Sequence, residues 1–365
     1  MSLYRFLPVF LILSIFSFKS VYAVDNLFEN ESYISCPEMN ADKATIVDFG
    51  GILWCVWEGS SSVNKKENSL WMSRYIDERW TKPLEFVTGD FCNPNLCRIT
   101  LKEILLFYTD NKDMSKVYCL RTINGGKTWL SPRLLPAGII GPQRGTPFFD
   151  KKTGTLLIPT SNSSGKSEDV DKNTSCWIEV CDSGVKKWYN RYGPIISETS
   201  VFGPSEPSII LNSRGKFKMF CRNRSRSYLE NDAFILYAES ADKGRTWGAF
   251  ENLIFPNPDS GIYALQMNSL VVVIGNYSFD KKKNMACLIS QDYADNWSRP
   301  ILIDADESEN PAAVFEGEEY LHIVYTVRAD GYKRIKYKKA KITNLLFSPM
   351  NGLEEEMKKV LPVRY

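Results

Sequence analysis

The sequence predicts an all-β protein built as a six-bladed β-propeller, and two observations carry this prediction. Phe, Tyr and Trp make up 13% of the 365 residues, and these residue types favour pleated, half-buried strands. A turn that ends in tryptophan recurs at intervals of 49 to 59 residues, at Trp80, Trp129, Trp188, Trp247 and Trp297. Groups of about four strands that return at such a spacing are typical of propeller blades.

The clearest copy of the turn is the segment 240–247, with the sequence SADKGRTW. Asp caps backbone N–H groups, Gly takes a positive φ, and Trp packs beneath the turn. The segment 122–129 is a close copy, 182–188 and 290–297 are looser ones, and 73–80 keeps only the ends. A last unit without the turn, 311–342, completes six blades.

The first residues read as an export signal. Arg5 supplies positive charge, residues 6–18 are nearly all apolar, and Val21-Tyr22-Ala23 offers a small-residue cleavage site. We therefore expect a signal peptide over 1–23, a lead-in over 24–39, a propeller over 40–345, and a tail over 346–365 with a short charged helix at 354–359. No later apolar stretch is long enough to span a bilayer, so we expect a protein without a transmembrane segment, secreted or held in a secretory lumen.

Glycosylation and cysteine content fit that compartment. Acceptor triplets for N-glycans begin at Asn30, Asn162, Asn173, Asn223, Asn276 and Asn296. Nine cysteines in an oxidising compartment favour disulfides such as Cys92 with Cys97 or Cys176 with Cys181. No cysteine pair has the spacing of a zinc site, and no cofactor or metal is expected.

Charge and histidine content exclude several functions. The formal net charge is only +2 and no long basic block is present, which argues against a nucleic-acid partner. The single histidine, His322, leaves no paired-histidine metal site and lies in an apolar run, so Ser-His-Asp chemistry is not expected.

Beyond the turns, the segments between them carry a family resemblance. They include Cys92-Asn93-Pro94, Gly141-Pro142-Gln143-Arg144, Glu206-Pro207-Ser208, Cys221-Arg222-Asn223-Arg224, residues 256–262 (PNPDSGI) and 321–326 (LHIVYT) followed by Arg328. With them, the turns resemble the Asp-boxes, or bacterial neuraminidase repeats, of sialidases, and the resemblance covers about residues 40–342. It implies a sialidase-like propeller that handles a carbohydrate, and an exo-acting glycoside hydrolase that releases terminal sialic acid or a similar acidic sugar.

That chemistry suggests roles for particular residues. Sialic acid carries a carboxylate, which arginines bind with a bidentate fork, and sialidases use a tyrosine nucleophile with a glutamate that draws off its proton. We expect Tyr263 as nucleophile, Glu206 as its partner, and Asp42 or Asp259 as the acid. The expected substrate-binding residues are Arg98, Arg144, Arg222, Arg224, Asn257 and Arg328.

Four departures from the family pattern bear on catalysis, and the first is that the arginine motif that opens many sialidases is not recognisable near Pro37. Asp42-Lys43-Ala44-Thr45 replaces a His-Ala-Ser-Thr-like segment, Tyr263 stands where relatives carry an acidic residue, and Asn310-Pro311 replaces a Tyr-Pro pair at the start of the last blade. Two alternatives therefore stay open: a propeller that binds acidic glycans without cleaving them, and a lyase or hydrolase for another acidic sugar.

Overall fold

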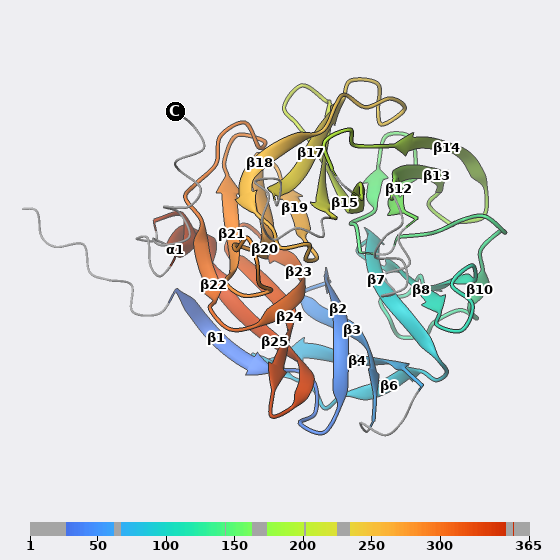
Figure 1. The fold of residues 1–365 in the computed structure, drawn as a ribbon. Coiled ribbons are helices and arrows are strands. Elements are labelled where there is room, and N and C mark those ends of the chain that lie inside the picture. Colours follow the sequence, from blue (N-terminus) through green and yellow to red (C-terminus); the bar gives the residue numbers. More distant parts are fainter. Residues whose placement is uncertain are drawn as a thin grey trace, which may run out of the picture.

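The computed structural model describes residues 27–61, 67–142, 144–162, 174–200, 202–224, 234–347 and 353. The expected signal peptide, the helix expected at 354–359 and the glycan acceptor Asn173 lie outside these residues. In the described part, six antiparallel sheets form a ring (Figure 1), which confirms the predicted six-bladed β-propeller.

Each blade is a chain-order meander that starts near the axis and runs outward. The first contains β2 (Asn40–Phe49), β3 (Ile52–Ser60), β4 (Ser69–Ile76), β5 (Arg79–Trp80) and β6 (Leu84–Val87), of which β5 and β6 both pair with β4. The second contains β7 (Phe91–Thr100), β8 (Glu103–Asp110), β9 (Val117–Thr122) and β10 (Arg133–Leu134). The third contains β11 (Phe148–Asp150), β12 (Thr155–Ser161), β13 (Cys176–Asp182) and β14 (Trp188–Ile195).

The remaining blades repeat this pattern. The fourth contains β15 (Pro204–Leu211), β16 (Phe217–Asn223), β17 (Phe234–Ser240) and β18 (Glu251–Pro256). The fifth contains β19 (Tyr263–Met267), β20 (Leu270–Asn276), β21 (Met285–Ser290) and β22 (Ile301–Asp304). The sixth contains β23 (Ser308–Glu316), β24 (Tyr320–Ala329) and β25 (Tyr332–Lys341), and the short helix α1 (Ile342–Leu346) follows it.

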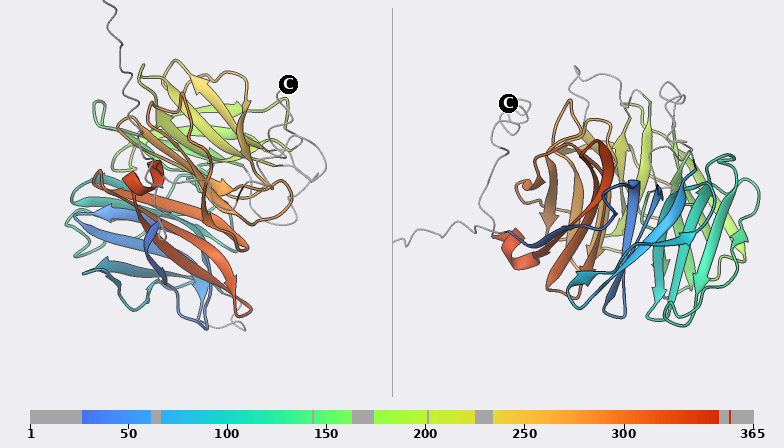
Figure 2. Two further views of the ribbon diagram at one scale, coloured as in Figure 1. Left: turned by 90° about the vertical axis from the view of Figure 1, so that its left-hand side faces the viewer. Right: turned by 90° about the horizontal axis from the view of Figure 1, so that it is seen from below.

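The ring is closed by a strand from the other end of the chain. β1 (Phe28–Tyr33) pairs antiparallel with β25 and becomes the outer strand of the sixth blade. Figure 2 shows this blue strand beside the red strands of the C-terminal blade. The largest apolar cluster lies at the same closure, where Trp57, Ile274 and Tyr325 from the first, fifth and sixth blades are fully buried. The burial of this apolar surface is the main force that holds the two ends of the ring together.

The tryptophan-ended turns have the capping geometry that the sequence predicts. Asp242 Oδ1 accepts hydrogen bonds from the backbone N–H groups of Arg245 and Thr246, and Gly244 has a φ of 82°. Trp247 Nε1 donates to the Gly244 carbonyl oxygen, which fixes the ring under the turn. Each copy thus satisfies its own backbone polar groups at the outer edge of a blade.

The structure contradicts both disulfides expected from the sequence, because each pair shares one strand. Cys92 and Cys97 both lie in β7, and Cys176 and Cys181 both lie in β13. Five steps along a strand span about 16 Å, far beyond the Cα separation that a disulfide tolerates. All nine cysteines are free in the structure. Cys176 instead faces Cys221 of the neighbouring blade, with their Sγ atoms 3.8 Å apart.

Candidate functional site

Four of the inner strands bulge where they reach the axis. The strand register shifts between Asp42 and Thr45 in β2, and equivalent shifts occur in β7, β15 and β23. The residues with positive φ at these bulges are Lys43 (50°), Asn93 (53°), Glu206 (52°) and Asn310 (56°). Three of the four precede proline, which disfavours helical backbone in the preceding residue. Strained backbone of this kind clusters at functional sites, because the surrounding fold must hold it in place.

The short segment 144–146 crosses the axis between the blades. Asn95 Nδ2 donates to the Gly145 carbonyl oxygen (2.9 Å), and Arg144 Nη2 donates to the carbonyl oxygen of Pro311 (3.1 Å). Gly145 packs so closely on the Pro207 carbonyl that no Cβ would fit there. The segment therefore brings inner strands of the second, fourth and sixth blades together. We call the polar cluster around it, on the side of the bulges, the hub.

Arg222 holds two hub carboxylates. Its Nε donates to Asp259 Oδ1 (2.6 Å), and its Nη1 donates to Glu206 Oε1 (3.0 Å). Burial disfavours the charge of Arg222, but Glu206 and Asp259 outweigh this and raise the pKa of the guanidinium. The other carboxylate oxygen of Glu206, Oε2, is buried and has no hydrogen-bond partner among the described residues. The ion pair through Oε1 thus orients Glu206, while Oε2 is the oxygen that a ligand could contact.

Asp42 is surrounded by donors. Its Oδ1 accepts hydrogen bonds from Asn310 Nδ2 and Thr326 Oγ1, both at 2.8 Å, and its Oδ2 accepts one from Lys333 Nζ at 2.6 Å. Burial alone would raise the pKa of Asp42, but Lys333 and Lys43 lower it well below its ordinary value. Asp42 is therefore ionised at neutral pH.

Asn310 and Glu206 share one small space. A Cβ built on Gly261 would lie 3.0 Å from Asn310 Oδ1 and 3.1 Å from Glu206 Oε2. Because the amide group of Asn310 donates to Asp42, its oxygen is the atom turned toward this space. Two acceptor oxygens thus face the same side of Gly261.

Lys43 and Glu58 extend the hub toward the second blade. Lys43 Nζ donates to Asn93 Oδ1 (3.1 Å) and lies 3.4 Å from Glu58 Oε1, while Glu58 Oε2 accepts the Asn93 backbone N–H at 2.7 Å. Burial raises the pKa of Glu58, against the effect of Lys43. Asp42 and Glu58 face each other across β2 and β3, so neighbouring carboxyl groups have pKa values shifted in opposite directions.

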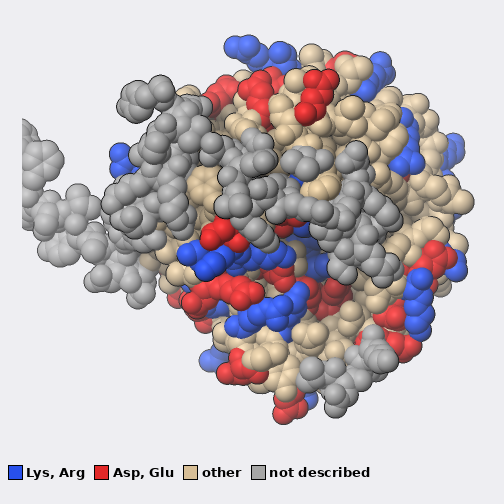
Figure 3. Space-filling model, viewed as in Figure 1, with Lys and Arg blue, Asp and Glu red and all other residues tan. Residues whose placement is uncertain are grey.

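Arg144 differs from the other hub cations. Its residue is only 6% exposed, no ion pair joins it to a carboxylate among the described residues, and its Nε has no hydrogen-bond partner there. A buried guanidinium without a counter-charge is costly, so an anionic group from outside the chain would stabilise it. Figure 3 shows basic and acidic side chains interleaved at the centre of this face.

Tyr263 lies on the opposite side of the segment 144–146. It lines a cavity of about 520 Å³ together with Asp48, which is at the other end of β2 from Asp42. Burial raises the pKa of Tyr263, and the groups that act on it in the other direction are Thr146 and Arg144. The structure shows no hydrogen bond between the phenol and Glu206. The predicted pair of Tyr263 and Glu206 is therefore not brought together.

The other expected binding residues fall into two groups. Arg222 and Arg144 are in the hub. Arg98 instead pairs with Asp48 (3.0 Å) at the cavity that Tyr263 lines, which we call the lower cavity. Arg328 pairs with Glu307 in an exposed position (3.2 Å). Asn257 is fully buried, and its Oδ1 accepts the Ser260 backbone N–H, so it caps a turn. Arg224 is 6% exposed, and its backbone pairs with Gly203.

Sequence reasoning gave no role to Lys43, Glu58, Glu309 or Lys333. Lys333 Nζ also binds Glu309 Oε1 (2.6 Å), so this lysine bridges two hub carboxylates. One signal was available in the sequence: Asn93, Glu206 and Asn310 each precede proline near the start of an inner strand. The lysine and glutamate partners carry no such signal. Among the described residues, no group of three or more potential metal ligands and no helix long and apolar enough to cross a membrane is present.

Comparisons with known proteins agree with this architecture. Residues 51–323 match the model of a family described as BNR repeat-like domain. No curated protein sequence matches the chain. A solved protein of unknown function from Dyadobacter fermentans superposes with a TM-score of 0.70 at 18% identity, covering 86% of this chain and 98% of that one.

Solved sialidases are also similar in fold. The K499G mutant of NanB sialidase from Streptococcus pneumoniae gives a TM-score of 0.65 at 11% identity, covering 89% of this chain and 72% of that one. Trypanosoma rangeli sialidase in complex with the inhibitor DANA gives 0.62 at 13% identity, covering 85% of this chain and 56% of that one. At such identities the likeness shows the fold alone.

Proposed function

The chain belongs to the BNR repeat-like domain family, and from this membership and the hub geometry we propose that it is a glycoside hydrolase that releases a terminal acidic sugar from a glycoconjugate. The observation that carries the proposal is a pair of polar groups at the hub that find no partner within the described part of the chain: the buried guanidinium of Arg144, which has no counter-charge there, and the Oε2 atom of Glu206. Buried polar groups are normally satisfied, so both indicate a missing ligand.

We expect Arg144 to bind the carboxylate of the acidic sugar. Arginine presents a planar fork of donors that matches a carboxylate, and burial strengthens such a contact. Burial and Arg144 disfavour the charge of Lys43, but Glu58 and Asp42 outweigh them and raise its pKa, so Lys43 stays charged and adds to the positive charge that would face a sugar carboxylate. The other hub cations already have carboxylate partners, since Arg222 and Lys333 contact two each and Lys43 contacts Glu58.

Glu206 and Asp42 supply the chemistry. A water molecule held between Glu206 Oε2 and Asn310 Oδ1 can give a proton to Glu206 as its oxygen attacks the anomeric carbon. The bond from this carbon to the aglycone oxygen breaks in the same step, and the leaving oxygen takes a proton from solvent, to which Glu206 returns the one it accepted. Glycoside cleavage passes through a transition state with positive charge on the sugar ring, and the ionised Asp42 lies next to Asn310 to stabilise it. In this scheme Tyr263 takes no part in the proton transfer. Its predicted role as the nucleophile can be tested directly.

The test is release of 4-methylumbelliferone from its sialic acid glycoside by the purified chain and two variants. We expect turnover by the wild type and a fall in kcat of about 10² to 10⁴ in Glu206→Gln, the usual size of a lost general base. An equal fall in kcat in Tyr263→Phe would instead support the phenol of Tyr263 as the nucleophile. Failure of the wild type on this glycoside and on the corresponding glucuronide would reject the proposal.

A second function, binding without cleavage, is favoured by one observation. Asn310 stands where the resemblance places the Tyr of a Tyr-Pro pair, and an amide group cannot replace a phenol in catalysis. Saturable binding of a sialoside without turnover would support this reading. A rise in ultraviolet absorbance on an acidic polysaccharide would instead indicate a lyase.

The cellular location is part of the same proposal. Residues 1–23 have the composition of a signal peptide. Glycoconjugates, the proposed substrates, are also what an exported protein would meet. Sequencing of the mature N-terminus after expression in a eukaryotic host is expected to give Val24 as the first residue. A mature protein that keeps residues 1–23 would contradict export by cleavage.

A further inference from the structure

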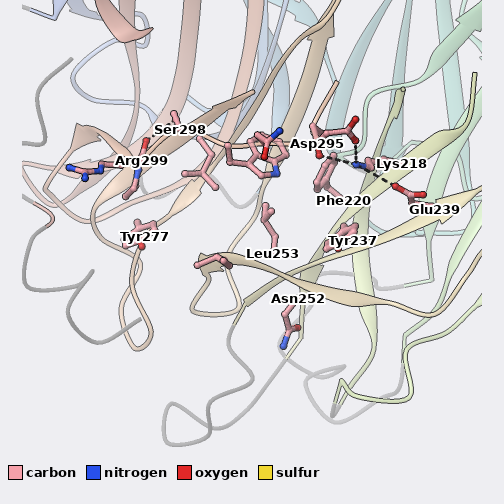
Figure 4. Close-up of a pocket in the computed structure, with 16 residues that line it drawn as sticks. Lys218, Phe220, Tyr237, Glu239, Asn252, Leu253, Tyr277, Asp295, Ser298 and Arg299 are labelled. Carbon is pink, nitrogen blue, oxygen red and sulfur yellow. Dashed lines mark hydrogen bonds and ion pairs between the residues drawn. The ribbon is translucent and has the colours of Figure 1, made fainter. Parts of the chain in front are cut away.

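A second cavity, of about 540 Å³, lies between the fourth and fifth blades. It is lined by β16, β17 and β18 on one side and by the tryptophan-ended turn of the fifth blade on the other, and no hub residue lines it. Its volume is in the range of sites that enclose a small molecule. Figure 4 shows its lining side chains.

Lys218 organises one end of this cavity. Its side chain is only 7% exposed, and its ammonium group contacts the Ala294 carbonyl oxygen (2.8 Å), Asp295 Oδ1 (3.1 Å) and Glu239 Oε1 (3.3 Å). Two of its N–H groups donate to Ala294 and Asp295, and Glu239 adds an ion pair. Asp295 and Glu239, which come from different blades, are held in place by the same cation. Each carboxylate is exposed, so its second oxygen can accept a hydrogen bond from a ligand.

Aromatic rings form the wall beside these carboxylates. Phe220 is buried and packs edge-on against Trp297, with 5.8 Å between the ring centroids, and Tyr237 lies on its other side at 6.4 Å. Trp297 is only half-buried, so part of its surface faces the cavity. Packing on Phe220 fixes the orientation of both rings before any ligand arrives.

We propose that this cavity binds a neutral pyranose unit. The carboxylates of Asp295 and Glu239 accept hydrogen bonds from sugar hydroxyl groups, and the Trp297 ring packs on the apolar face of the sugar. Lys218 and Arg299 balance these two negative charges, so the site has no excess charge that favours an ion. In Figure 4, Arg299 lies at the opposite end from Lys218, where its guanidinium adds donors for the sugar oxygens.

The experiment is titration with lactose, followed by saturation-transfer NMR, on protein produced without N-glycans because Asn296 heads an acceptor triplet. We expect saturable binding in the millimolar range, which corresponds to about 4 kcal/mol of binding free energy. Trp297→Leu and Asp295→Asn should each weaken it about tenfold or more, as expected for a lost hydrogen bond to a charged group or a lost ring contact. Circular dichroism spectra check that both variants fold.

Two controls separate this site from the rest of the molecule. Trp247→Leu removes the equivalent tryptophan of the neighbouring turn, which does not line the cavity, and should leave lactose binding unchanged. Glu206→Gln should also leave it unchanged, so a failed hub proposal and a failed cavity proposal give different results. Absence of saturable lactose binding, persistence of binding in both cavity variants, or tighter binding of putrescine than of lactose would each overturn the inference.

Discussion

The space between Glu206 and Asn310 can be closed with one methyl group. Gly261→Ala places a Cβ 3.0 Å from Asn310 Oδ1 and 3.1 Å from Glu206 Oε2, closer than ordinary contact with either oxygen. Gly261 does not have a positive φ, so alanine fits the backbone there. The variant therefore tests the use of this space without breaking a turn.

Gly261→Ala should lower the stability only slightly but the turnover strongly. Crowding the two oxygens costs about 1–3 kcal/mol of stability, and the reduced entropy of the unfolded chain returns about 0.4–1 kcal/mol. A net loss near 1 kcal/mol lowers Tm by about 2–4 °C. The methyl group also displaces the water that Glu206 would deprotonate, so kcat should fall about 100-fold or more.

The assay is release of 4-methylumbelliferone, with Tm measured on the same samples. Gly248→Ala is the matched control, because its Cβ would lie 3.6 Å from the nearest atom, the Glu239 carbonyl oxygen, in ordinary contact. This control should keep the wild-type rate. A folded Gly261→Ala protein with wild-type turnover would refute the role given to the space beside Glu206.

Three further predictions concern other parts of the fold. Gly145→Ala should lower stability by roughly 3 kcal/mol in a denaturant titration, because its Cβ would collide with a carbonyl oxygen of the fourth blade; an unchanged midpoint would contradict the close approach. Hydrogen bonds from the Thr246 side chain and backbone lower the pKa of Asp242 to about 2, so its contribution to stability is present above its ordinary pKa near 3.8 and is lost as pH falls toward 2. NMR titration should show that low value, and Thr246→Val should raise it. Oxidation should link Cys176 to Cys221 rather than the pairs within one strand, which peptide mapping by mass spectrometry would show.

The fold was predictable because its signal is local and repeated. In the turn at Asp242, each cap and each ring contact lies within five residues, so the sequence pattern contains the whole structure of the turn. The closing strand was not predictable in the same way. β1 alternates half-buried and exposed residues, but its partner β25 lies about 300 residues away, and only the closed ring brings the two strands together.

The hub was predictable only in part, because its contacts join distant blades. Glu206 and Arg222 come from adjacent strands of one blade and were both expected at the site. The bond between Asp42 and Lys333 spans the ring closure, and no local pattern indicates it. Tyr263 was assigned from its place after a loop, yet its side chain faces the lower cavity, and one residue of register along a strand decides such an orientation.

Binding of an anionic sugar at Arg144 is the claim on which the hub chemistry depends, and calorimetric titration with DANA measures it directly. DANA is the inhibitor in the solved Trypanosoma rangeli sialidase complex. We predict one saturable site whose affinity falls about 100-fold or more in Arg144→Met, the loss of a buried charge-assisted contact, and stays unchanged in Arg133→Met, a control at an exposed arginine of β10. No binding to the wild type, or equal affinity in Arg144→Met, would contradict the account.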